Sequence, residues 1–88
     1  MRIEYKNQRV EYANKTVDYR YTMYYAEDPK GFKVSELIEV LQHIYANKSD
    51  SYISATIMKI DDMFTKNINE VRVCEWADGQ NIGFYNYN

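Results

Sequence analysis

The first 26 residues alternate apolar and polar side chains with the period of two that is typical of β-strands. Three stretches carry this alternation, at residues 2–6, 9–13 and 16–25, and the apolar parity changes from each stretch to the next. Because a strand cannot change parity without a turn or a bulge, the changes predict tight hairpins at Asn7-Gln8 and Asn14-Lys15. The expected product is a three-stranded antiparallel meander.

In this predicted meander, the tyrosines of the third strand face inward. If both loops contain two residues, Tyr5 faces Val10 and Tyr12 faces Val17. Tyr24 falls outside the apolar stripe and is expected on the outward face. The expected inward face consists of Ile3, Tyr5, Val10, Tyr12, Val17, Tyr19, Tyr21, Met23 and Tyr25.

Helical spacing replaces this alternation in the middle of the chain. Residues 35–47 are predicted to form a helix, and residues 51–66 a second one, although the β-branched side chains of the latter also favour a strand. The first helix carries an apolar stripe of Val34, Leu37, Ile38, Leu41, Ile44 and Tyr45. The second carries a narrower stripe of Ile53, Ile57, Ile60 and Phe64.

The C-terminal residues return to the strand pattern. "NEVRVCEW" alternates apolar and polar side chains, Asp78-Gly79 is a turn signal, and "NIGFYNY" is typical of a closing strand. The order β-β-β-α-α-β-β predicts a single α+β domain over residues 1–88. Its small antiparallel sheet combines the N-terminal meander with the C-terminal hairpin, and one or two helices pack on one face.

Composition and charge exclude several classes of function. Eleven basic and 13 acidic residues give a formal charge of −2, which argues against a protein that binds duplex DNA. The single cysteine, Cys74, excludes an internal disulfide and a cysteine zinc cluster. The chain has no apolar run of membrane-spanning length, and its first residues lack a signal-peptide core, so a cytoplasmic location is expected.

No arrangement of side chains predicts an enzyme, a cofactor or a metal site. His43 is expected on the helix surface beside Glu39, opposite the apolar stripe. The acids at Asp61-Asp62 lack the spacing of a calcium-binding loop, and the glycines near the C-terminus do not form a phosphate-binding loop.

Charged side chains form two bands on the outward face of the predicted meander. Such bands can orient a protein partner and speed its association, although they also suit a solvated face of compensating ion pairs. Tyr24 on the same face would supply an aromatic anchor. The acidic band is Glu4, Glu11 and Asp18, and the basic band is Lys6, Arg9 and Arg20.

These features favour a small non-enzymatic protein-binding module that inhibits or modulates a partner. The many residues with AT-rich codons suggest a low-GC bacterium or its phage, whose small proteins often act on host or defence proteins. The alternative is a binder of a small ligand, a nucleotide or single-stranded nucleic acid, with bases stacked on Trp76, Tyr85 and Tyr87. A homodimer through unpaired edge strands also remains open.

Overall fold

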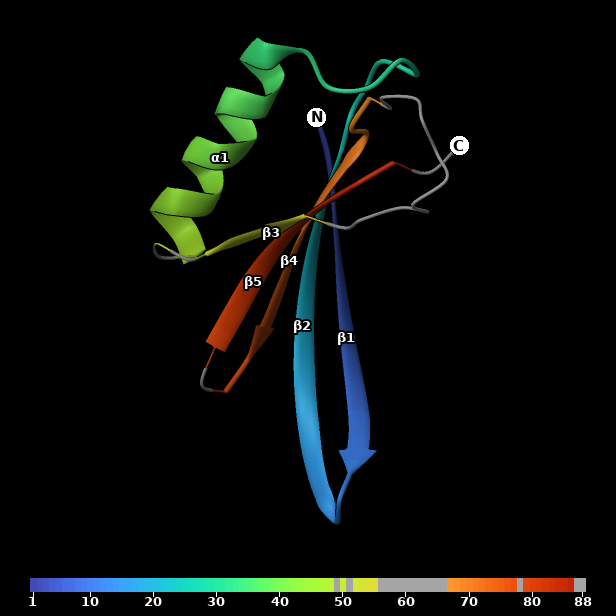
Figure 1. The fold of residues 1–88 in the computed structure, drawn as a ribbon, viewed down its shortest axis with the longest axis vertical. Helices are drawn as coiled ribbons and strands as arrows, with labels where there is room; N and C mark the ends of the chain where they lie inside the picture. The colour runs from blue at the N-terminus through green and yellow to red at the C-terminus, as the bar shows by residue number, and fades with distance from the viewer. Residues whose placement is uncertain (49, 51, 56–66, 78, 87–88) are drawn as a thin grey trace.

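A five-stranded mixed sheet with one helix on one face forms the described part of the chain (Figure 1). The structure is a computed structural model that describes residues 1–48, 50, 52–55, 67–77 and 79–86. Its elements are β1 (Arg2–Tyr12), β2 (Lys15–Tyr25), α1 (Val34–Lys48), β3 (Ile53–Ala55), β4 (Glu70–Trp76) and β5 (Gly79–Tyr85). The strands lie in the order β1-β2-β4-β5-β3. No helix among these residues is long and apolar enough to cross a membrane.

The α+β class is confirmed, while the predicted order of elements is wrong. The sheet is mixed rather than antiparallel, because β3 runs parallel to β5. Residues 53–55 of the predicted second helix form β3, where the Ser54 hydroxyl donates to the Ile82 carbonyl oxygen at 2.8 Å. Residues 56–66 of that prediction lie outside the described residues. The helix at 35–47 and the C-terminal hairpin are both confirmed, as α1 and as β4–β5. The predicted turn at Asp78-Gly79 is displaced, because Gly79 is the first residue of β5 and pairs with Trp76.

The predicted turn at Asn7-Gln8 does not form, because residues 2–12 are one uninterrupted strand. The hairpin turn lies at Ala13-Asn14, whose φ angles of 48° and 64° suit a type I′ turn. Tyr12 therefore pairs with Lys15 and not with Val17, a shift of two residues from the predicted register. The apolar residues of β1 change from odd to even positions because they change from one face of the sheet to the other. Ile3 and Tyr5 lie on the side of α1, and Val10 and Tyr12 lie on the opposite side.

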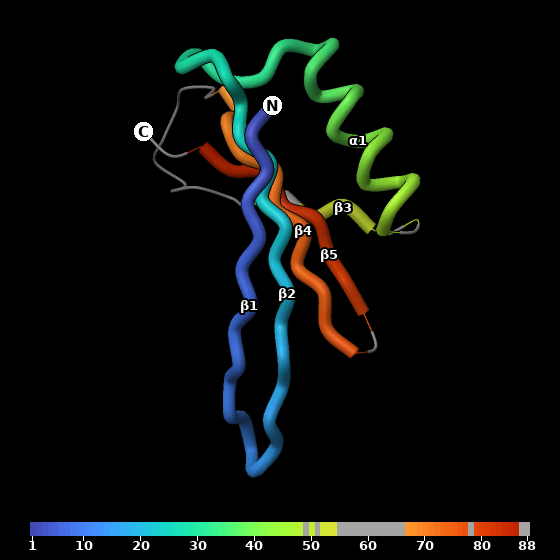
Figure 2. Tube along the Cα trace, turned by 180° about the vertical axis from the view of Figure 1, so that it is seen from behind, coloured from blue at the N-terminus to red at the C-terminus, as the bar shows by residue number. Residues whose placement is uncertain are grey.

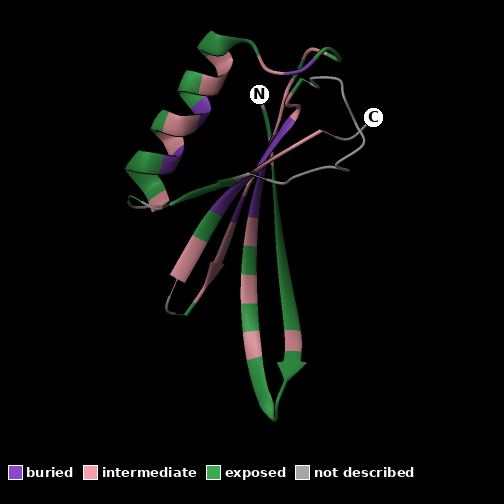
Figure 3. Cartoon of the chain, in the orientation of Figure 1, coloured by how far each residue is buried: buried purple, intermediate pink, exposed green. Residues whose placement is uncertain are grey.

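The buried face of the sheet is the one that carries Tyr24, which reverses the prediction. Residues paired across antiparallel strands share a face, so Tyr24 lies in one row with Val71, and Thr22 with Val73. Val40 and Ile44 of α1 pack onto these rows, and the buried residues gather where the helix meets the sheet (Figure 3). The odd-numbered residues predicted to fill the core lie on the opposite face, namely Val17, Tyr19, Tyr21, Met23 and Tyr25.

Only one side of the apolar arc of α1 contacts the sheet. Val40 and Ile44 are buried, whereas Val34 and Tyr45 from the predicted stripe are 78% and 69% exposed. His43, predicted on the surface, instead lies against the sheet, with its Nδ1 atom 2.7 Å from the hydroxyl oxygen of Tyr24. The predicted stripe therefore identified the helix correctly. The side of α1 that faces the sheet, however, includes Val40 and His43, which the stripe left out.

The β1–β2 hairpin projects beyond the rest of the molecule (Figure 2). β2 pairs with β4 only from Arg20 to Tyr25, so that, among the strands the structure describes, residues 15–19 pair with β1 alone. No described strand pairs with the outer edge of β1. The tip of the hairpin is consequently a two-stranded ribbon with both faces exposed to solvent.

Candidate functional site

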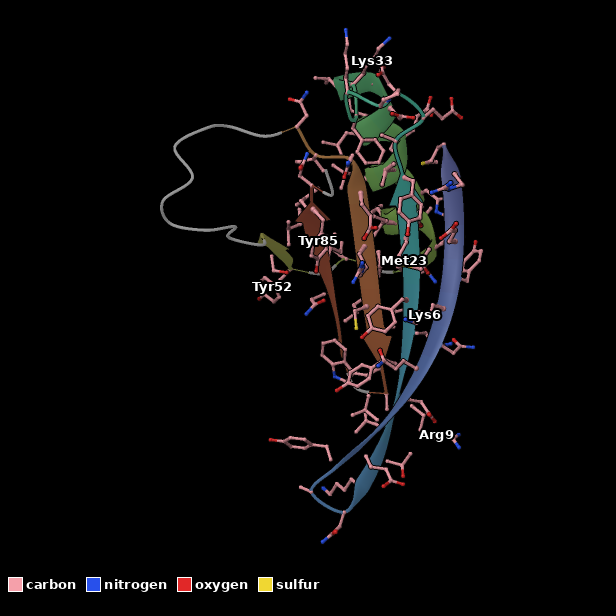
Figure 4. All side chains as sticks on the ribbon, turned by 90° about the vertical axis from the view of Figure 1, so that its right-hand side faces the viewer. Lys6, Arg9, Met23, Lys33, Tyr52 and Tyr85 are labelled. Carbon is pink, nitrogen blue, oxygen red and sulfur yellow. The ribbon has the colours of Figure 1, made fainter. Side chains whose placement is uncertain are left out.

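The face of the sheet turned away from α1 concentrates aromatic side chains. Strand pairing places tyrosines of β2 beside aromatic residues of β4 and β5 on this side. We call this surface the aromatic face and define it by Tyr19, Tyr21, Tyr25, Trp76 and Tyr85. Figure 4 views the sheet with α1 behind it, and Tyr85 is labelled there.

The rings at the lower end of this face contact one another across neighbouring strands. The Tyr19 ring centroid lies 6.4 Å from that of Tyr21, and 6.2 Å from that of Trp76 in an edge-to-face arrangement. Aromatic pairs at such separations attract each other beyond simple burial. The three rings are only partly buried, so they form a pre-arranged surface that a ligand can reach.

Arginine side chains lie on the rings at the upper end of the same face. The guanidinium carbon of Arg2 lies 4.5 Å from the Tyr25 ring centroid, and that of Arg72 lies 4.9 Å from the Tyr85 ring centroid. Arg72 also forms an ion pair of 2.9 Å with the buried carboxylate of Glu70. These cation–π contacts and the ion pair hold both guanidinium planes in place.

Two shallow cavities flank the aromatic face. One, of about 490 Å³, lies at its upper end and is lined by Arg2, Tyr25 and Arg72 among others. The other, of about 480 Å³, lies beside Trp76, where β2 extends past the end of β4. Both hollows place an aromatic ring against charged side chains, an arrangement that suits amphipathic ligands or side chains.

The aromatic face carries excess positive charge although the chain as a whole is negative. Strand pairing assigns four basic residues to it, Arg2, Lys6, Lys15 and Arg72, against the acidic residues Glu4 and Glu70. The opposite sheet face has the reverse balance, with Arg9 and Arg20 against Glu11, Asp18 and Glu75. A negatively charged partner would therefore meet its more favourable field on the aromatic face.

Two tyrosines of the aromatic face, Tyr21 and Tyr25, have a raised hydroxyl pKa. Burial raises the pKa of Tyr21, and its hydrogen bond with Cys74 raises it further. Burial also raises the pKa of Tyr25, with added repulsion from the carboxylates of Glu70 and Glu4. Both hydroxyls are already engaged within the sheet, since Tyr25 donates to the Met23 sulfur at 3.7 Å and Tyr21 is hydrogen-bonded to Cys74.

The predicted charge bands are divided between the two sheet faces. Glu4 and Lys6 lie on the aromatic face, whereas Glu11, Asp18, Arg9 and Arg20 lie on the opposite face. Arg9 Nε donates to Asp18 Oδ1 at 2.9 Å, and Arg20 Nη2 lies 3.7 Å from Glu75 Oε2. The three acids do not line up, because the hairpin is formed by one long strand and not by two short ones. Their role in partner binding stays a prediction.

The aromatic residues predicted to bind a partner or ligand lie in different parts of the structure. Tyr24 is fully buried, with its ring edge-to-face against His43 at a centroid distance of 5.5 Å. Trp76 and Tyr85 lie on the aromatic face, on neighbouring strands, and Tyr87 lies outside the described residues. Sequence reasoning missed Tyr19, Tyr21 and Tyr25 as surface residues. The available signal was their hydroxyl groups, since a row of tyrosines suits a partly solvated face better than a dry core.

A second exposed apolar surface lies on the outer side of α1. Ile38 is 49% exposed, and Val34 and Tyr45 of the same stripe are more exposed still. Tyr52 and Ile53, which follow the helix in the chain, are also exposed. Exposed apolar groups of this size often mark interaction surfaces.

The described residues contain no group of three or more His, Cys, Asp or Glu side chains able to hold a metal ion. Comparison with protein-family models, curated proteins and solved structures gave no match for this chain. The aromatic face is therefore interpreted from its own side chains and geometry.

Proposed function

We propose that this protein is a small non-enzymatic protein-binding module that docks a partner on the aromatic face and modulates that partner. The observation that carries the proposal is the residue composition of the face. Tyrosine, tryptophan, methionine and arginine are enriched at the centres of protein–protein interfaces. The same aromatic residues and arginine also dominate the positions that contribute most binding energy.

The rigidity of the face supports the same proposal. Tyrosine and tryptophan have only two side-chain torsions, so they lose little conformational entropy on binding. The ring contacts of Tyr19 and the arginine stacking on Tyr25 and Tyr85 restrict these side chains before a partner arrives. Such pre-organisation lowers the cost of association.

Alanine substitutions with a matched control test the proposal. Tyr19→Ala and Trp76→Ala remove rings from the centre of the face, whereas Tyr5→Ala removes a 72% exposed tyrosine from the opposite face. Partners captured by the wild-type protein and identified by mass spectrometry are then titrated against each purified variant. We expect losses of about 30-fold or more for Tyr19→Ala or Trp76→Ala, as for interface hot spots, and wild-type affinity for Tyr5→Ala. Wild-type affinity in all three variants would contradict the proposal.

Single-stranded nucleic acid is the second candidate partner, and the charge of the aromatic face favours it. Aromatic rings beside basic side chains bind single strands by base stacking and phosphate attraction. A titration with single-stranded oligonucleotides should then quench Trp76 fluorescence, and added salt should weaken the binding. An unchanged Trp76 signal would exclude this candidate and leave protein binding unaffected.

A further inference from the structure

β1 presents a long unprotected edge. It pairs with β2 residue by residue from Arg2 to Tyr12, with no bulge, and its other edge has no partner among the described strands. It also contains no proline. Native sheets usually protect an exposed edge with bulges, proline, charged side chains or a covering segment, because free backbone groups on an edge pair readily with another strand. Of these devices, the described part of the chain gives β1 only charged side chains, among them Lys6. This edge therefore has the properties of a pairing surface.

The hairpin geometry identifies which backbone groups point outward. Tyr12 and Lys15 flank the two-residue turn at Ala13-Asn14, so they form a pair that exchanges backbone hydrogen bonds. Because hydrogen-bonded and non-bonded pairs alternate along an antiparallel ladder, the even-numbered residues of β1 bond to β2. The odd-numbered residues direct their N–H and C=O groups out of the sheet, namely Ile3, Tyr5, Asn7, Arg9 and Glu11.

We propose that this edge pairs with the same edge of a second copy of the chain, antiparallel and with the two-fold axis at Asn7. This register alone pairs all eleven residues of β1. The outward backbone groups then meet one another: Asn7 faces Asn7, and Tyr5 faces Arg9 of the second copy. Alternate pairs exchange two bonds each, which gives about ten new backbone hydrogen bonds.

The side chains are compatible with the same register. Arg9 faces Tyr5 of the second copy, and Arg2 faces Tyr12, so each arginine meets an aromatic ring and not another cation. No two like charges lie directly opposite each other anywhere along the paired strands. Moving the axis one residue towards the N-terminus would place Lys6 opposite Lys6, which disfavours that register, and moving it one residue the other way would leave Arg2 and Ile3 without partners in the second β1 strand.

A second copy fits this edge for a further reason, namely symmetry. A two-fold axis perpendicular to the sheet keeps both α1 helices on one side and both aromatic faces on the other. The two five-stranded sheets then form one continuous sheet. The dimer does not depend on the proposed function, but it would place two aromatic faces side by side for a single extended partner.

Cysteine cross-linking tests the register directly. In a Cys74→Ser background, Asn7→Cys places two thiols across the axis, at the backbone separation that a disulfide requires. We expect mild oxidation to produce a covalent dimer. Glu11→Cys is the control, because its two copies would lie roughly 27 Å apart along the strands. Equal cross-linking of both variants, or of neither, would overturn the proposed register.

Proline substitutions test the edge itself. Asn7→Pro removes an outward N–H, whereas Gln8→Pro removes one that bonds to β2. Sedimentation velocity should give twice the chain mass for the wild type and the single-chain mass for Asn7→Pro, which should remain folded by circular dichroism. Gln8→Pro should instead lose stability. A monomeric wild type would overturn the proposal, as would a folded Asn7→Pro variant that remains dimeric, since another surface would then form the dimer.

Discussion

The two faces of the sheet are both rich in apolar and aromatic residues, yet only one of them is a core. On the side of α1, Tyr24, Val71 and Val73 are fully buried, while Tyr19 and Tyr21 on the aromatic face remain partly exposed. The difference arises from the helix, which covers one face and leaves the other open. Alternation along a strand therefore tells which residues share a face, but the packing of another element decides which face becomes the interior.

The largest expected difference in stability is between alanine substitutions of two tyrosines in β2, Tyr24 and Tyr21. Tyr24→Ala removes a fully buried ring and should lower the free energy of unfolding by about 3–5 kcal/mol, a large part of the stability of a domain this small. Tyr21→Ala on the aromatic face should cost only about 1 kcal/mol. Urea denaturation of both variants measures the difference. Similar losses would show that the aromatic face is as structurally important as the core.

A matched pair of valines makes the same comparison on α1. Val40 is fully buried, and Val40→Ala should destabilise the protein by about 2 kcal/mol. Val34 is 78% exposed, and Val34→Ala should change stability by no more than about 0.5 kcal/mol. Thermal or urea unfolding distinguishes the two. A clear loss in Val34→Ala would indicate that the outer side of the helix is also covered.

The buried hydroxyl of Tyr24 predicts a loss of stability at alkaline pH. Burial, followed by the charges of Tyr5 and Glu75, raises the pKa of Tyr24 from 10.0 to about 12. The unfolded chain loses this proton first, so stability is complete below pH 10 and falls as the pH rises towards 12. We expect a fall of about 1–2 kcal/mol from this group. Tyr24→Phe should reduce the fall without abolishing it, because Tyr21 and Tyr25 shift in the same direction. An identical pH profile in Tyr24→Phe would contradict this assignment.

The smallest effects compare two ion pairs on the side of α1. Glu75 is 17% exposed and lies 2.9 Å from Lys48 of the helix, so Glu75→Gln should cost about 1 kcal/mol. Asp18 pairs with Arg9 at the same distance on the solvated hairpin tip, and Asp18→Asn should leave the unfolding midpoint unchanged. Denaturant titrations at low and high salt provide the measurement. A larger loss in Asp18→Asn would show that the hairpin tip is more restrained than its exposure indicates.

The local elements of the fold were largely predictable from the sequence. The helical spacing of Leu37, Leu41 and Ile44 suffices for α1, and the alternation in "NEVRVCEW" followed by a turn signal suffices for the C-terminal hairpin. The misplaced turn at Asn7-Gln8 has a specific cause. The parity rule assumes that one face is buried along the whole strand, whereas β1 passes from beneath the helix to a free hairpin tip. The parallel pairing of β3 with β5 is a tertiary contact that local periodicity does not encode.

The candidate site was predictable only in part. Trp76 and Tyr85 were identified as possible stacking residues, and the structure places both on the aromatic face. The charge bands were not placed correctly, because they depended on a register with one additional turn. Tyr24 was placed on the wrong face for a different reason: α1 packs on the face that carries the even-numbered residues of β2, and alternation along the strand does not show which face a helix will cover. The buried face of a hairpin is thus decided by the element that packs on it and not by the hairpin alone.

The position of β4 between β2 and β5 affects the order in which the protein can fold during synthesis. β1, β2 and α1 leave the ribosome before β4 and β5, with Tyr24, Val40 and Ile44 still uncovered. Their packing partners Val71, Val73 and Ile82 belong to the last two strands. The core therefore closes only after β4 and β5 have been synthesised, and until then a growing chain exposes both its apolar side chains and the free edge of β1 to chaperones and proteases.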